Sequence, residues 1–154
     1  MADVTVRLDS REVERLLTAM VHRLGTLRSF FEATWPILHR SVMTNFRVGG
    51  RPARWQALAP ATVKARQRKG TWRTGVGSDQ PILQEYGQLR QSIGSVFRMT
   101  DTALEYGTND RRAIWLQEGT SRMPARPFLL FQAEDVTQIT AVAAAYAFGT
   151  RGMS

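Results

Sequence analysis

The stretch that decides the fold is SIGSVFRMTDTALEYG, residues 92–107 of a chain of 154 residues. Apolar and polar side chains alternate over residues 92–99 and again over 103–107, a spacing typical of strands with one buried face. The segment Thr100-Asp101-Thr102 separates the two runs and has the small, polar composition of a turn. We therefore predict an antiparallel β-hairpin.

Upstream of the hairpin, the sequence predicts one strand followed by two helices. Residues 4–8 alternate in the manner of a short strand. Apolar side chains recur at helical spacing over residues 9–24 and again over 27–46. Pro36 lies inside the second pattern, so we predict a long helix with a kink at that position.

Downstream of the hairpin, the sequence predicts a helix, a strand and a further helix. Residues 112–118 have the pattern of a short helix that Gly119 stops. Residues 128–131 are apolar and predict a strand that pairs with the hairpin. Residues 133–146 predict an alanine-rich helix, and residues 149–154 are expected to fray.

In this order, the elements predict an α+β fold within one domain that covers residues 1–154. We expect a small antiparallel sheet packed against a long N-terminal helix pair and a C-terminal helix. Between the helix pair and the hairpin, residues 47–81 predict a long extended loop with a short helix over 60–67. A loop of this length inside a domain usually has a function.

The basic excess of the chain is concentrated around that loop. The net charge is +8 and the pI is about 11.1, yet residues 33–78 contain no Asp or Glu. Such a field favours an anionic partner, either nucleic acid or an acidic protein surface; the alternative is a solvated basic loop. The segment holds nine cations: Arg40, Arg47, Arg51, Arg54, Lys64, Arg66, Arg68, Lys69 and Arg73.

No catalytic template fits the sequence. The chain has no cysteine, which excludes disulfides, thiolate metal sites and cysteine nucleophiles. His22 and His39 stand on predicted helices without a carboxylate one turn away, and no Gly-x-Ser-x-Gly elbow occurs. The glycine-rich residues 70–77 lack the Gly-Lys-Ser/Thr ending of a phosphate loop. We therefore predict no enzyme, no metal site and no cofactor.

Neither a membrane segment nor an export signal is indicated. The chain has no apolar run long enough for a transmembrane helix. Its N-terminus also lacks the apolar region of a signal peptide. We expect the protein to be made in the cytoplasm, with no membrane partner.

Aromatic rings beside cations are the first candidate contact residues. Arg54-Trp55 and Trp72-Arg73 have this arrangement, which is enriched at interface hot spots and also suits stacking on bases. Trp55 fits equally well a core anchor that pins the loop to the domain. Trp35 and Trp115 are expected in the core.

A proline-framed arginine is the second candidate. In PARPF, residues 124–128, two prolines restrict the backbone on either side of Arg126 to an extended form. With Gly119 as a hinge, the segment predicts a rigid arm. The alternative is a simple turn that leads into a strand.

Several groups of residues form one pattern in chain order: FRVGGRPARWQALAPAT (residues 46–62), Ile82-Leu83, residues 87–93, Tyr106-Gly107-Thr108, Gln117-Glu118-Gly119 and residues 124–129. Taken together and in this order, these groups resemble the phage virion morphogenesis family, which includes tail completion proteins of Mu-like and P2-like phages. The similarity covers residues 10–145. Two departures are a leucine, Leu116, near the site where family members commonly have a histidine, and extra length at residues 72–77.

The resemblance implies a structural protein of a tailed-phage virion: a tail completion, tail terminator or neck protein at the head–tail junction. Such proteins form rings, usually sixfold, that cap the tail tube and join it to the head connector. The implied partners are further copies of the chain in a homohexamer ring, the tail tube protein and the head–tail connector or neck proteins. DNA in the lumen would be a non-specific contact. The implied location is the neck or tail end of the virion, after synthesis in the host cytoplasm.

Two sets of residues are then the candidate contacts. Those expected at the subunit or tail-tube interface are Arg47, Arg51, Arg54, Trp55, Trp72, Arg122, Arg126 and Phe128. Those expected to face the lumen and its DNA are Lys64, Arg66, Arg68, Lys69 and Arg73. The rival hypothesis is a nucleic-acid-binding module without sequence specificity that uses the basic loop, although the chain has no helix-turn-helix or zinc-finger motif.

Overall fold

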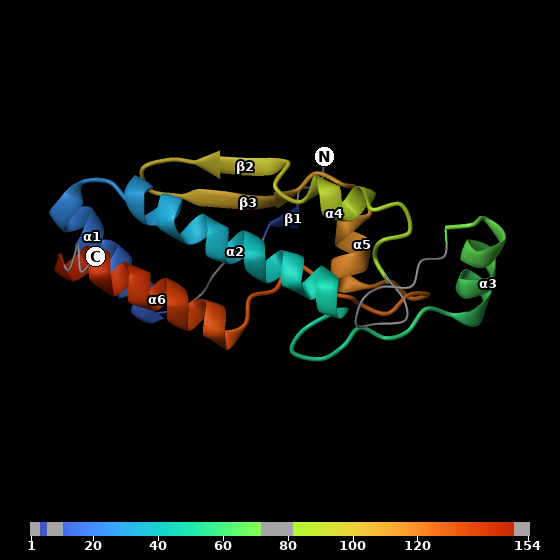
Figure 1. Cartoon of the computed structure of the whole chain (residues 1–154). Coiled ribbons are helices and arrows are strands. Elements are labelled where there is room, and N and C mark those ends of the chain that lie inside the picture. Colours follow the sequence, from blue (N-terminus) through green and yellow to red (C-terminus); the bar gives the residue numbers. More distant parts are fainter. Residues whose placement is uncertain (1–3, 6–10, 72–81, 150–154) are drawn as a thin grey trace.

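The computed structural model of the protein describes residues 4–5, 11–71 and 82–149, and it confirms the α+β fold (Figure 1). No helix in these ranges is both long and apolar enough to cross a membrane. The elements in chain order are β1 (Val4–Thr5), α1 (Arg11–Leu24), α2 (Arg28–Val48), α3 (Pro60–Arg68), α4 (Gln88–Ser92), β2 (Val96–Met99), β3 (Leu104–Thr108), α5 (Ala113–Glu118) and α6 (Ala133–Phe148).

The predicted hairpin is present, with β2 and β3 as its strands. The two strands are antiparallel, and Phe97 is paired with Tyr106 near their middle. The turn between them is tied to the helical layer, because the backbone N–H of Leu27 donates to the carbonyl of Asp101 over 2.7 Å. The hairpin thereby fixes where α2 begins.

The hairpin pairs with β1, which is the third strand of the sheet. The predicted strand at residues 128–131 is absent, so that prediction is wrong. β1 pairs antiparallel with β3, and the strand order is β1-β3-β2. The remainder of the predicted N-terminal strand, residues 6–8, lies outside the described residues. Residues 128–131 belong to no strand, and the chain bends at Leu129.

Amide side chains, rather than a neighbouring strand, satisfy the backbone of residues 128–131. The Oε1 atom of Gln117 accepts hydrogen bonds from the N–H groups of Phe128 and Leu129, each over 3.1 Å. The Nδ2 group of Asn45 donates to two carbonyls of the same segment over 2.8 and 2.9 Å. Because buried backbone groups need partners, these side chains from α5 and α2 take the place of a strand ladder.

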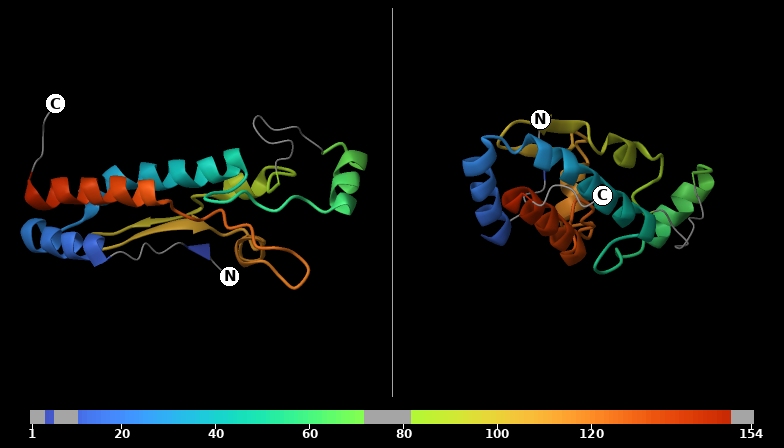
Figure 2. Two further views of the ribbon diagram at one scale, coloured as in Figure 1. Left: turned by 90° about the horizontal axis from the view of Figure 1, so that it is seen from below. Right: turned by 60° about the vertical axis from the view of Figure 1, so that its left-hand side comes forward.

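The helices predicted from periodicity are present as α1, α2, α5 and α6. α2 continues through Pro36 as one helix and ends at Gly49. That glycine has a φ of 77°, in the left-handed region that glycine adopts at low cost. α2 and α6 run side by side, with the hairpin beneath them (Figure 2). Gly149 ends α6, and the tail expected to fray lies beyond it, outside the described residues.

Two clusters of buried apolar side chains hold these layers together. One surrounds the C-terminal half of α2 and includes Phe46, Trp55 and Phe128. The other joins α1, α6 and the start of α2 and includes Met20 and Phe30. The first cluster lies next to the loop that carries most of the basic residues.

Two tryptophans expected in the core lie outside it. Trp35 is half-buried, and its ring meets that of Phe97 edge-on with centroids 5.6 Å apart. Trp115 is 55% exposed, whereas Ala113 on the same helix is fully buried. Ala113 and Trp115 are two residues apart in the helix, so their side chains point about 200° apart around its axis. For that reason α5 cannot bury both side chains against the same core.

Candidate functional site

The candidate site is a basic arm, residues 51–71, that leaves the end of α2 and carries α3. In Figure 1 and Figure 2, α3 stands at one end of the molecule, away from α1 and the hairpin tip. The arm contains no acidic residue. Its position relative to the body is set by three buried or half-buried arginines and one tryptophan.

Trp55 anchors the start of the arm in the core. Its ring meets that of Phe46 edge-on at 5.9 Å, and its indole N–H donates to the carbonyl of Pro127 over 3.0 Å. Gly50 allows this approach, since a Cβ there would lie 2.7 Å from the indole ring. Of the two interpretations of Trp55, the structure therefore supports the core anchor.

Arg126 holds the next part of the arm from the opposite side. Its side chain is buried, and its guanidinium donates to the carbonyl of Gln56 over 3.1 Å and to that of Ala57 over 3.2 Å. Burial, with a smaller contribution from the positive charge of Arg66, lowers the pKa of Arg126 from its usual value. The arginine thus acts as a clamp on arm carbonyls.

Arg66 fixes the far end of the arm by pointing back toward the body. It is 8% exposed, its Nη2 donates to the carbonyl of Ile82 over 3.0 Å, and its Nε lies 3.8 Å from Glu85. Lys69 lies 3.5 Å from the same carboxylate, and the hydroxyl of Thr71 donates to it over 3.2 Å. One carboxylate therefore ties the last turn of α3 to the residues before α4.

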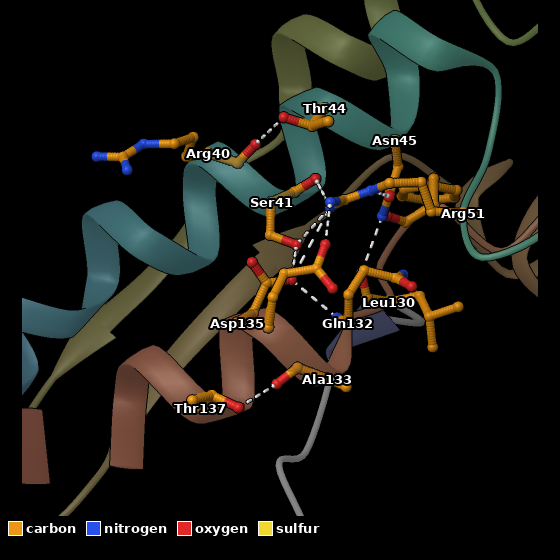
Figure 3. A network of polar contacts seen from close by, with 12 residues as sticks. Arg40, Ser41, Thr44, Asn45, Arg51, Leu130, Gln132, Ala133, Asp135 and Thr137 are labelled. Carbon is orange, nitrogen blue, oxygen red and sulfur yellow. Dashed lines mark hydrogen bonds and ion pairs between the residues drawn. The ribbon is translucent and has the colours of Figure 1, made fainter. Parts of the chain in front are cut away.

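Arg51 joins the base of the arm to both long helices (Figure 3). Its Nε donates to Oδ1 of Asn45 over 2.8 Å, and its Nη2 donates to the carbonyl and hydroxyl oxygens of Ser41 over 2.9 and 2.8 Å. Its Nη1 reaches Glu134 of α6 over 3.2 Å. The Ser41 hydroxyl in turn donates to Asp135, so the network links α2, the arm and the first turn of α6.

The α6 end of this network is closed by a capping box. Oδ2 of Asp135 accepts the backbone N–H of Gln132 over 2.8 Å, and the Gln132 side chain accepts in return from the first turn of the helix. A carboxylate in the first turn also interacts favourably with the helix dipole. The arm is thus anchored to a helix end that is closed by a capping box.

The structure divides the predicted contact residues into two groups. Four of them are buried inside the fold and offer little surface to a partner; they are Trp55, Arg66, Arg126 and Phe128. Arg51 is largely used within the fold as well. The exposed members are Arg47 and Arg122 on the body and Arg54, Lys64, Arg68 and Lys69 on the arm. Trp72 and Arg73 lie outside the described residues.

The residues that sequence reasoning missed are polar and sit in apolar surroundings. Asn45 is fully buried and lies in α2 between the buried Val42 and Phe46. A polar residue on the apolar stripe of a predicted helix was the available signal. Gln117, on α5, belongs to one of the groups that carry the family resemblance, but nothing in the sequence pointed to its partners, which are backbone groups of a segment predicted as a strand.

The Asp110–Arg112 pair, at the start of α5, gives a pH-dependent prediction. The guanidinium donates to the carboxylate over 2.6 and 3.0 Å, and this hydrogen bonding lowers the pKa of Asp110 against the opposing effect of burial. Because the pKa of Asp110 is lower in the folded protein than in the unfolded chain, its ionised carboxylate stabilises the fold. This contribution is fully present above the unfolded-state pKa of about 3.9 and is lost as the pH falls through the folded-state pKa. Asp110→Asn should therefore destabilise the protein near neutral pH and progressively less in acid. Urea midpoints of both proteins across this range test it, and a constant difference would contradict it.

The described residues contain no group of three or more His, Cys, Asp or Glu placed to hold a metal ion. His39 is instead engaged with Tyr106, with 2.7 Å between Nδ1 and the phenol oxygen. Burial raises the pKa of that phenol, which therefore keeps its proton.

The described residues thus form an α+β body with an anchored basic arm. The model of the phage virion morphogenesis family matches residues 8–147, nearly the whole chain. The chain belongs to this family, and its role is accordingly in the structure or assembly of a phage virion. Searches of curated proteins and of solved structures gave no match.

Proposed function

We propose that the chain is a tail completion protein that forms a ring at the head–tail junction of a tailed phage. The observation that carries the proposal is the basic arm, because its exposed cations are held out from the body by buried clamps. In a ring, each subunit contacts its neighbour through two different surfaces. An arm fixed at one end of the molecule suits one of those surfaces.

The ring would cap the tail tube and join it to the head connector or neck proteins. The exposed arm residues Arg54, Lys64 and Arg68 would reach an acidic face of the neighbouring subunit or of the tube. Arm cations that face the lumen would meet DNA phosphates without reading sequence. The chain would carry out no chemistry of its own.

Native mass spectrometry of the purified chain, across salt and protein concentration, tests ring formation. A discrete closed oligomer, and in particular a homohexamer, is the expected result. Monomers both alone and in the presence of purified tails would contradict the proposal. Strong, salt-dependent DNA binding by such monomers would favour the alternative function, a non-specific nucleic-acid-binding module.

A charge reversal on the arm identifies what the arm contacts. Arg68→Glu should weaken ring assembly by about tenfold or more, because an exposed cation that meets an acidic neighbour becomes a like charge. Arg66 is unsuitable for this test, since its buried side chain holds the arm. The matched control is Arg40→Glu, an exposed arginine on α2 in the body. The concentration at which rings dissociate is the measurement.

Two other results of this experiment have definite meanings. Intact rings with weakened DNA binding would place Arg68 at the lumen instead of at a protein neighbour. Equal loss of assembly in Arg68→Glu and Arg40→Glu would show a general effect of net charge, and would contradict a specific role for the arm.

A further inference from the structure

A groove lies beside the arm, between α4, α5 and the residues that precede α4. Its volume is about 320 Å³, and Arg66 of the arm forms part of its wall. Leu89, Leu116 and Met123 make much of its lining apolar. The groove is separate from the outward cations of the arm, because Arg66 points inward while Lys64 and Arg68 are exposed.

Two large aromatic side chains line this groove and remain exposed. Trp115 is 55% exposed and Tyr86 is 58% exposed. Leaving large aromatic surface in water beside an apolar groove forfeits favourable burial, and such patches mark interaction sites. Tryptophan and tyrosine are also the residues that most often carry the binding energy of protein interfaces.

The charges that line the groove favour an anionic visitor. Arg66 and Arg112 line it, and the carboxylate among its lining residues is Glu85. That carboxylate already pairs with Arg66 and Lys69. Arg112 is paired with Asp110, but its side chain is 49% exposed. Because Glu85 is shared between two cations, positive charge is in excess around the groove.

We propose that this groove docks a segment of a partner protein in which a large apolar side chain is flanked by carboxylates. The apolar side chain would lie against Trp115, Tyr86 and Leu116. The carboxylates would meet the partly exposed cations of Arg112 and Lys69. An apolar lining gives little to a nucleic acid backbone, which favours a protein.

The inference rests on the proposed function for where the partner is found, namely among the other proteins of the head–tail junction. It does not require the ring. The groove is built by residues of one chain, so docking can be tested on protein in any oligomeric state.

The test begins with selection from a library of random dodecapeptides on the wild-type protein, with Trp115→Ser as the counter-selection. The expected peptides carry an aromatic or large aliphatic residue flanked by Asp or Glu. The dissociation constant of an enriched peptide is then measured by fluorescence anisotropy. Trp115→Ser and, independently, Tyr86→Ser should weaken binding by about tenfold or more. Phe148→Ser, which removes an equally large exposed ring at the end of α6, should leave binding unchanged.

Several outcomes would overturn the proposal. These are the absence of enrichment over the Trp115→Ser protein, enrichment of peptides without acidic residues, and equal weakening by Phe148→Ser. Displacement of the peptide by a DNA oligonucleotide only in wild type, and not in Trp115→Ser, would assign the groove to nucleic acid. Loss of self-association in Trp115→Ser by native mass spectrometry would assign it to a second copy. If the wild-type chain forms no ring but binds the peptides, the proposed function fails while the docking site stands.

Discussion

Replacing Gly119 by alanine should lower the free energy of unfolding by about 3–5 kcal/mol. The residue has φ 79° and ψ 179°, a combination that glycine alone adopts without strain. A Cβ at this position would lie 2.6 Å from the backbone nitrogen of Ala125 and 2.9 Å from the carbonyl of Met123. Because both contacts are backbone atoms, the neighbouring turn would have to move.

The consequence would extend to the arm. The turn after α5 is closed by the N–H of Arg126, which donates to the carbonyl of Leu116 over 2.7 Å. Moving Ala125 would displace Arg126, whose guanidinium holds the carbonyls of Gln56 and Ala57. The hinge interpretation of Gly119 is thus replaced by one of close packing, in which the glycine lets the clamp reach the arm.

Urea unfolding of Gly119→Ala measures the effect, and Gly49→Ala is the matched control. Gly49 also has a positive φ, of 77°, but nothing lies within 4 Å of its added Cβ. It should therefore lose only about 1–2 kcal/mol from backbone strain. Equal losses for the two variants would show that the close approach to Ala125 contributes nothing.

Replacing Asn45 by alanine should cost about 3–5 kcal/mol, the second large effect. Asn45 is fully buried, and its amide donates to the carbonyls of Phe128 and Leu130 while its oxygen accepts from Arg51 (Figure 3). Alanine would leave one buried carbonyl, one half-buried carbonyl and one half-buried guanidinium N–H without these partners. Each such loss costs about 1–3 kcal/mol when water cannot replace the bond.

The neighbouring Thr44 provides the control for this prediction. Its hydroxyl donates to the carbonyl of Arg40 on the exposed side of α2, so Thr44→Ala should change the free energy of unfolding by less than about 0.5 kcal/mol. Asn45→Ala should also loosen the base of the arm. The measurement is hydrogen exchange of the backbone amide of Trp55, which donates to the carbonyl of Gly49 and should exchange faster in the variant. A variant as stable as wild type would show that water occupies the vacated site.

Local patterns predicted much of the fold because the elements concerned bury one face. The alternation at residues 92–107 and the helical spacing before and after it correspond to β2, β3 and the long helices. The strand predicted at residues 128–131 failed for a definable reason. Its apolar run is equally compatible with a core segment whose backbone is satisfied by side chains, and Gln117 and Asn45 come from distant parts of the sequence.

The sequence predicted the basic loop, but it did not predict which arginines of the candidate site are exposed and which are buried. The sequence identified the basic loop, and the exposed Arg54, Lys64 and Arg68 agree with it as a charged surface. The sequence could not distinguish these exposed cations from the buried Arg66 and Arg126, because the letter for arginine is the same whether the side chain faces water or donates to a carbonyl. Only the path of the backbone decides which guanidinium finds buried oxygen atoms.

The sequence by itself determined the fold class, the positions of the hairpin and long helices, the concentration of positive charge and the family. Those features depend on periodicity, composition and residue order, all of which are local properties of the chain. The tertiary structure alone decided that β1 completes the sheet, that Arg51, Arg66 and Arg126 fasten the arm, and that Trp115 lies exposed beside a groove. The strand pairing and the arginine clamps join residues that are separated in the chain, and the exposure of Trp115 depends on which elements pack beside α5. None of these exists until the fold brings the elements together.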